Sequence, residues 1–176
     1  MEENILEIVE KSCRIHRDVI AVKYLSHREI VEKSYGDLWD DIRKTAVILR
    51  NNGLCGTHIA LVGSSSYEWI CAYMAILFTG NTAVPLDANL SAPELHELLN
   101  RSGSIALFCG ASRKDVITEL TDDCPEMNIV FTMEKKVDIE HLEGADSNPQ
   151  LAILSFEQLR NEITVPVSYT HLRAHE

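Results

Sequence analysis

The spacing of apolar residues changes several times along the first third of the chain. Apolar side chains recur every three or four positions over Asn4–His16, which predicts an amphipathic helix. Asp18–Leu25 and Glu29–Ser34 alternate instead and are rich in Val, Ile and Tyr, so they predict a β-hairpin. Helical spacing then returns and continues to Gly53, a residue suited to a left-handed helix end. The sequence therefore predicts helix, hairpin and helix in this order.

Two of the predicted helices begin with capping-box spacing, a serine three residues before an acidic residue. Ser34 and Asp37 open the helix after the hairpin, and Ser91 and Glu94 open a later one with Pro93 in its first turn. The two side chains of such a box accept hydrogen bonds from backbone N–H groups that the helix leaves unpaired. These pairs indicate where both helices start.

Beyond residue 57, short apolar runs alternate with helical segments. The runs have the continuous apolar character of buried parallel strands. This alternation predicts an α/β fold, in which right-handed crossovers build a doubly wound, mostly parallel sheet with helices on both faces. A polar, acidic loop is expected over Glu134–Gln150. The predicted strands are His58–Val62, Thr82–Pro85, Ile105–Cys109 and Asn128–Thr132, and the further helices are Tyr67–Phe78, the Ser91 helix, Ser112–Leu120 and Ser155–Glu162.

Composition and charge favour a cytoplasmic protein. The 176 residues, 45% of them hydrophobic, suffice for one compact domain or part of a larger one. A net charge of -11 argues against a nucleic-acid-binding surface, which needs clustered Lys and Arg. The N-terminal Met1-Glu2-Glu3 lacks the pattern of a signal peptide, and the apolar stretch Trp69–Phe78 is shorter than the ~20 residues of a transmembrane helix. We expect no transmembrane segment.

The cysteines predict neither a zinc site nor a disulfide framework. Their number is odd, and no two of them form a Cys-x-x-Cys pair. Buried, reduced thiols are therefore expected. The five residues are Cys13, Cys55, Cys71, Cys109 and Cys124.

A turn of one glycine and three serines is a candidate anion site. Gly63, Ser64, Ser65 and Ser66 follow a predicted strand and precede a helix, where free N–H groups and the helix dipole can bind an anion such as phosphate. The alternative is that the serines only cap the helix, and the absence of a Walker or Gly-x-Gly-x-x-Gly pattern favours it.

The remaining side chains provide no catalytic residue and no metal site. Aromatic residues of the Tyr67–Phe78 helix are expected to pack in the core, because they have helical spacing. His58 and His96 each lack a second ligand nearby in the sequence and are expected to be structural. Asp40 and Asp41 are expected on a solvated helix face rather than in acid–base chemistry.

Two longer segments have more specific motifs. The first is Lys33–Leu38, followed by a helix and Leu49–Gly53. The second is Leu77–Asp87, a helix end, a glycine and a strand that closes in Pro-Leu-Asp. Together they resemble motifs of the adenylate-forming ligases, the family of acyl-CoA synthetases and peptide-synthetase adenylation domains. The order of elements agrees over Ile5–Leu159, and the departure is Phe78-Thr79, where the family commonly has Lys and Ala.

Within this family, Ser66–Ile70 and Leu99–Ser102 look most like bacterial long-chain fatty-acid–CoA ligases. The resemblance implies a parent enzyme that uses ATP, Mg²⁺ and CoA. A carboxylic acid, in this group a fatty acid, attacks the α-phosphate of ATP, and the thiol of CoA then takes the acyl group from the acyl-adenylate. The chain would form the first sheet subdomain of that enzyme.

The family's nucleotide-binding motifs have no counterpart in the sequence. Its phosphate loop, rich in Ser, Thr and Gly and ending in Pro-Lys-Gly, is missing, as are its later adenine-binding motifs and catalytic Lys. The chain is therefore expected to be inactive by itself, without a cofactor of its own. Val167–Glu176 resemble a translated transposon-end sequencing adapter, so residues 1–165 are interpreted as a truncated ligase domain and 166–176 as a non-native tail.

Two alternatives stay open. One is an amino-acid-activating adenylation domain of a peptide synthetase. The other is a stand-alone α/β module that binds an anion at the Gly63–Ser66 turn. The acyl substrate, the acceptor thiol and the oligomeric state do not follow from the residues.

Overall fold

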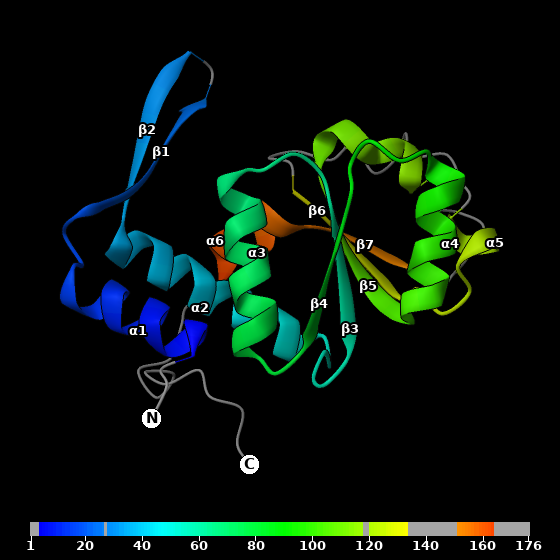
Figure 1. Cartoon of the computed structure of the whole chain (residues 1–176), viewed down its shortest axis with the longest axis horizontal. Coiled ribbons are helices and arrows are strands. Elements are labelled where there is room, and N and C mark those ends of the chain that lie inside the picture. The colour runs from blue at the N-terminus through cyan, green and yellow to red at the C-terminus, as the bar shows by residue number, and fades with distance from the viewer. Residues whose placement is uncertain (1–3, 27, 118–119, 134–150, 164–176) are drawn as a thin grey trace.

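The computed structural model describes residues 4–26, 28–117, 120–133 and 151–163, which form two sheets and the helices around them (Figure 1). The predicted loop Glu134–Gln150 and the predicted tail 166–176 lie outside these residues. The helices are α1 (Ile5–Ile15), α2 (Tyr35–Asn51), α3 (Tyr67–Phe78), α4 (Ala92–Ser102), the 3₁₀ helix η1 (Ala111–Val116), α5 (Leu120–Asp123) and α6 (Phe156–Glu162), and the strands are β1 (Ile20–Ser26), β2 (Glu29–Ser34), β3 (His58–Val62), β4 (Thr82–Leu86), β5 (Ser104–Cys109), β6 (Ile129–Thr132) and β7 (Ala152–Ser155).

Five parallel strands form the main sheet in the order β4–β3–β5–β6–β7. The connection from β3 to β4 runs to one side, and the chain then returns past β3 to build β5, β6 and β7 on the other side. This is a doubly wound order, in which successive crossovers place helices on opposite faces. The predicted α/β class, with a preceding helix and β-hairpin, is confirmed.

Alternate residues of each strand enter two separate cores. Leu61 and Phe108 point into the larger core, which α2, α3 and α6 cover. Val62 and Leu107 point into the smaller core, which α4, η1 and α5 cover. The two groups of helices lie on either side of the sheet in Figure 1. Burial on both faces explains why the strands are continuously apolar rather than alternating.

The N-terminal hairpin forms a sheet of its own beside α1 and α2. Strands β1 and β2 pair antiparallel, with Leu25 opposite Ile30. Both predicted capping boxes are present at the amino ends of α2 and α4, and the Ser34 backbone N–H and hydroxyl donate to Asp37 at 2.9 Å each. These hydrogen bonds, the backbone one first, lower the pKa of Asp37.

Two parts of the predicted element pattern are wrong. The expected helix Ser112–Leu120 is instead η1 followed by the short α5, because Arg113 leaves the helical region at φ -127°. Its guanidinium donates to both oxygens of Asp115 and to the Ala88 carbonyl, which holds this conformation. Strand β7 was not predicted, since four residues are too few for a pattern and the strand exists through its pairing with β6.

Composition also led us to expect no transmembrane segment and buried thiols. Within the described residues, no helix combines the length and apolar character needed to cross a bilayer. All five cysteines are free, and four are buried as expected. Cys55 is exposed, so the expectation is wrong for this residue. It lies in the turn between α2 and β3, outside both cores.

Candidate functional site

The predicted anion turn lies at the topological switch point of the sheet. Strands β3 and β5 are neighbours, and from them the chain proceeds to opposite sides of the sheet. In open α/β sheets, ligands bind outside the carboxyl ends of the strands at such a point. Gly63–Ser66 directly follows β3, so the structure places all four predicted residues there.

Backbone contact fills the position between the two strand ends. Gly63 has φ +147°, and a Cβ atom on it would lie 3.0 Å from the Cα of Gly110, the residue after β5. The Gly110 N–H donates to the Val62 carbonyl at 2.8 Å, which continues the pairing of the strands. The methyl carbon of Met133, after β6, is 3.5 Å from the same Cβ position. The ends of β3 and β5 are therefore in close main-chain contact at Gly63, with no room for a side chain there.

The serines of the turn differ in their environment. Ser66 caps α3, because its hydroxyl accepts a hydrogen bond from the Trp69 N–H at 3.1 Å. Ser64 and Ser65 are exposed. Glu68 lies in the first turn of α3, where its negative charge opposes an incoming anion. The capping interpretation thus holds for Ser66, and the anion site stays a prediction for the other residues.

Substituting Ser66 with Ala is expected to lower the free energy of unfolding by about 1 kcal/mol, because the Trp69 N–H loses its acceptor. Ser65→Ala is the matched control and is expected to change stability by less than about 0.5 kcal/mol. Urea unfolding followed by circular dichroism measures both. Equal effects of the two variants would contradict the assignment of Ser66 as the cap.

A buried carboxylate is the main polar feature that the sequence did not reveal. Asp41 was expected on a solvated face, but it is only 9% exposed. The Tyr67 hydroxyl donates to its Oδ2 at 2.8 Å, and the Lys33 Nζ lies 3.6 Å from the same oxygen. Nη1 of Arg160 is 4.0 Å away, and Lys44 approaches Oδ1 at 3.9 Å. The expectation failed because Lys33, Tyr67 and Arg160 come from other elements of the fold.

The phenol of Tyr67 keeps its proton in this cluster. Burial raises the pKa of Tyr67 above its ordinary value, and Cys71 and Asp41 raise it further. Tyr67 is 2% exposed and stacks on Tyr24 of the hairpin at 5.7 Å between ring centres. Burial also raises the pKa of Cys71 to about 12, which keeps this thiol protonated and unreactive.

The aromatic residues of α3 have structural roles. Tyr67 and Phe78 are buried, and Phe78 packs edge-on against Trp39 at 5.2 Å. Trp69 and Tyr73 are half-buried and stack on each other at 5.3 Å. The prediction that these residues pack rather than form an open stacking platform is confirmed for the two buried rings.

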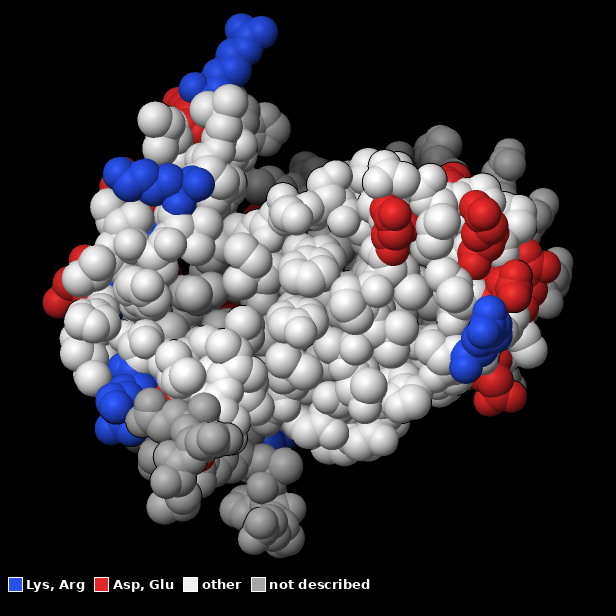
Figure 2. Space-filling view, viewed as in Figure 1, with Lys and Arg blue, Asp and Glu red and all other residues white. Residues whose placement is uncertain are grey.

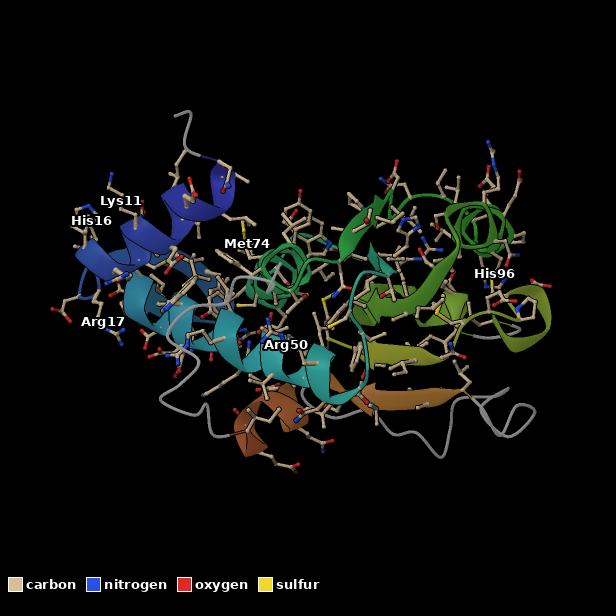
Figure 3. All side chains as sticks on the ribbon, turned by 90° about the horizontal axis from the view of Figure 1, so that it is seen from below. Lys11, His16, Arg17, Arg50, Met74 and His96 are labelled. Carbon is tan, nitrogen blue, oxygen red and sulfur yellow. The ribbon has the colours of Figure 1, made fainter. Side chains whose placement is uncertain are left out.

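His58 and His96, which the sequence predicted to be structural, each contact a neighbouring element of the fold. His96 is buried and lies between α4 and α5 (Figure 3), with Nδ1 2.6 Å from Asp123 Oδ2 and Nε2 2.7 Å from the Val116 carbonyl. Nδ1 of His58 contacts the Ser102 carbonyl. Both contacts tie an element to its neighbour, in agreement with a structural role.

Charge and metal-ligand geometry add no further site. On the face shown in Figure 2, acidic side chains gather over the α4 end, and the centre carries neither acidic nor basic side chains. Among the residues that the structure describes, no three His, Cys, Asp or Glu side chains come together in a way that could hold a metal ion.

Known proteins resemble this chain in sequence and in structure. It is 21% identical to a polyketide synthase–nonribosomal peptide synthetase of Aspergillus flavipes over 92% of its length and 4% of that protein. It is 30% identical to a long-chain-fatty-acid–CoA ligase of Mycobacterium tuberculosis over 53% of its length and 19% of that protein. The chain thus spans less than a quarter of either relative.

A solved structure supports the fold. The A-PCP didomain of carboxylic acid reductase from Segniliparus rugosus, in complex with AMP, superimposes with a TM-score of 0.79 and 14% identity, covering 94% of this chain and 28% of that one. A likeness at this identity speaks for the architecture. In sequence, a profile of the family described as AMP-binding enzymes matches residues 9–170. Because this match covers most of its residues, the chain belongs to the AMP-binding enzyme family.

Proposed function

We propose that the chain forms the first sheet-containing part of a ligase that activates a carboxylic acid with ATP and transfers the acyl group to CoA. The observation that carries the proposal is the family match over residues 9–170. The long-chain-fatty-acid–CoA ligase among the relatives supports a fatty acid as substrate. Part of the proposed tail 166–176 lies within the matched range, and its assignment as non-native remains a proposal.

The proposed reaction has two steps. A carboxylate oxygen attacks the α-phosphorus of ATP, and the bond from that phosphorus to pyrophosphate breaks, which leaves an acyl-adenylate. The sulfur of CoA then attacks the acyl carbon, and AMP leaves with the electron pair of the cleaved C–O bond. Mg²⁺ would neutralise phosphate charge in such a reaction. Among the described residues no three His, Cys, Asp or Glu side chains come together in a way that could hold a metal ion, and no residue here is assigned to the metal.

In this proposal the chain acts as a scaffold. At the switch point, the main chains of Gly63 and Gly110 pack closely against each other. The turn residue with an identified role, Ser66, caps a helix. Both observations support a part of the enzyme that holds other segments in place rather than one that contacts the reacting atoms.

An adenylation domain of a peptide synthetase is the second candidate. The match to a polyketide synthase–nonribosomal peptide synthetase over 92% of the chain favours it. Sequencing the reading frame downstream separates the two candidates. A carrier-protein domain after the ligase would support the second candidate and contradict the first.

Purified chain is expected to show no ATP–pyrophosphate exchange with any carboxylic acid, because its sequence lacks the family's phosphate loop that ends in Pro-Lys-Gly. Exchange is measured with labelled pyrophosphate against a panel of fatty and amino acids. The same assay on the longer reading frame is the positive control, and there we expect exchange that depends on a fatty acid. Exchange above background by the chain alone would contradict the scaffold role, and a longer frame inactive with every acid would contradict the ligase.

A further inference from the structure

One oxygen of Asp41 faces helices that are far apart in the sequence. Oδ2 accepts the hydroxyl hydrogen of Tyr67, the first residue of α3, at 2.8 Å. The same oxygen lies 4.0 Å from Nη1 of Arg160, which is on α6. Tyr67 directly follows Ser66, so the contact reaches the turn at the switch point. Helix α2 thus connects α6 with the start of α3 through a single carboxylate.

Arg160 lies among carboxylates and ring faces, and one of its guanidinium nitrogens has no hydrogen-bond partner among the described residues. Its side chain is 8% exposed, and Nη1 has no hydrogen-bond partner among the described residues. Nη2 lies 4.0 Å from Glu68, and the guanidinium carbon is 5.7 Å from the centre of the Tyr67 ring. A buried guanidinium with an unpaired nitrogen depends on its neighbouring carboxylates for compensation of its charge. Any movement of α6 therefore changes the field at Asp41.

The first turn of α3 has hydrogen bonds that report on this contact. The Trp69 N–H donates to the Ser66 hydroxyl and the Ile70 N–H to the Ser66 carbonyl, each at 3.1 Å. Tyr67 lies between Ser66, which supplies both acceptors, and the two donor amides. Movement of Tyr67 away from Asp41 would therefore disturb both hydrogen bonds. Trp69 and Ile70 belong to α3 and not to α6, so a change in their exchange rates would report an effect of α6 on another helix.

We propose that Asp41 is a positioning residue, which transmits the docking of α6 through Arg160 and Tyr67 to the Gly63–Ser66 turn. Its importance for a ligase rests on the proposed function, because the turn lies where a sheet of this order meets its ligand. The coupling itself is a property of the described residues. Arg160 also lies near Glu68 and the Tyr67 ring, so substitution of Asp41 is needed to distinguish the route through this carboxylate from these direct contacts.

Hydrogen exchange of single amides, followed by NMR on the whole chain, tests this coupling. Arg160→Met is expected to accelerate exchange at Trp69 and Ile70 about fivefold, a size typical of interacting residues. The Leu95 N–H, which donates to Ser91 in the first turn of α4, serves as the reference amide and should keep its rate. Arg101→Met is the matched control, because this exposed arginine pairs with Glu97 within α4.

A double-mutant cycle distinguishes transmission through Asp41 from general loosening. In an Asp41→Asn background, Arg160→Met should accelerate Trp69 and Ile70 by less than about 1.5-fold, because the link is already broken. Additive effects, unchanged rates at Trp69 and Ile70, or equal acceleration at Leu95 would each overturn the proposal. If Arg160→Met does not fold, Tyr67→Phe tests the Asp41–Tyr67 half of the route by removing only the hydroxyl, and faster exchange at Trp69 and Ile70 is again expected. No ATP-dependent readout is involved, so the outcome is independent of the proposed function.

Discussion

Replacing Gly63 with Ala is expected to lower the free energy of unfolding by about 3 kcal/mol, because two penalties act on the same residue. Its φ of +147° belongs to a region that side chains with a Cβ rarely adopt. The added Cβ would also lie 3.0 Å from the Cα of Gly110 and 3.1 Å from its nitrogen. Neither neighbour can yield easily, since both are backbone atoms joined to β5. Urea unfolding gives the size of the loss.

Two other glycines separate these penalties. Gly110→Ala introduces the close contact without a positive φ and is expected to cost about 2 kcal/mol. Gly56→Ala introduces the strain of a φ of +66° where no atom lies within 4 Å, and about 1 kcal/mol is expected. If Gly63→Ala were no more costly than Gly56→Ala, the close contact between the ends of β3 and β5 would be contradicted.

The sequence predicted elements whose signals are local. The capping box of Ser34 and Asp37 and the alternation in the hairpin depend on residues a few positions apart, and both are present. Strand β7 has no such signal, because its four residues become a strand only by pairing with β6. The break in the helix after Ser112 likewise depends on a hydrogen bond from Arg113 to the distant Ala88.

The candidate site shows the same division between local and distant interactions. The Gly63–Ser66 turn could be found from its composition, because a glycine followed by serines before a helix is a local pattern. The contact of Gly63 with Gly110 could not, since it depends on the order of the strands. Asp41 was predicted, together with Asp40, to lie on a solvated helix face. Its burial results from Tyr67 and Arg160, which the fold brings to it.

Phe108→Ala is expected to have the largest effect on stability, a loss of about 4 kcal/mol. Phe108 is fully buried in β5, and its ring centre lies 4.7 Å from that of Phe131 in β6 and 5.3 Å from that of Phe156 in α6. Truncation would leave a cavity between the sheet and α6. The neighbouring rings of Phe131 and Phe156 are rigid and cannot fill it. Ile30→Ala, at a side chain 73% exposed, is the control and should change stability by less than about 0.5 kcal/mol.

The edge-to-face contact between Phe108 and Phe156 can be measured separately from the cavity. A double-mutant cycle with Phe108→Leu and Phe156→Leu is expected to give an interaction energy of about 1 kcal/mol, the usual value for such a ring pair. Both substitutions keep a large apolar side chain, so the cycle reports the geometry of the two rings. Helix α6 reaches the sheet through Phe156 and reaches α2 through Arg160. An interaction energy near zero would mean that the edge-to-face geometry of these two rings contributes nothing to the docking of α6 on the sheet.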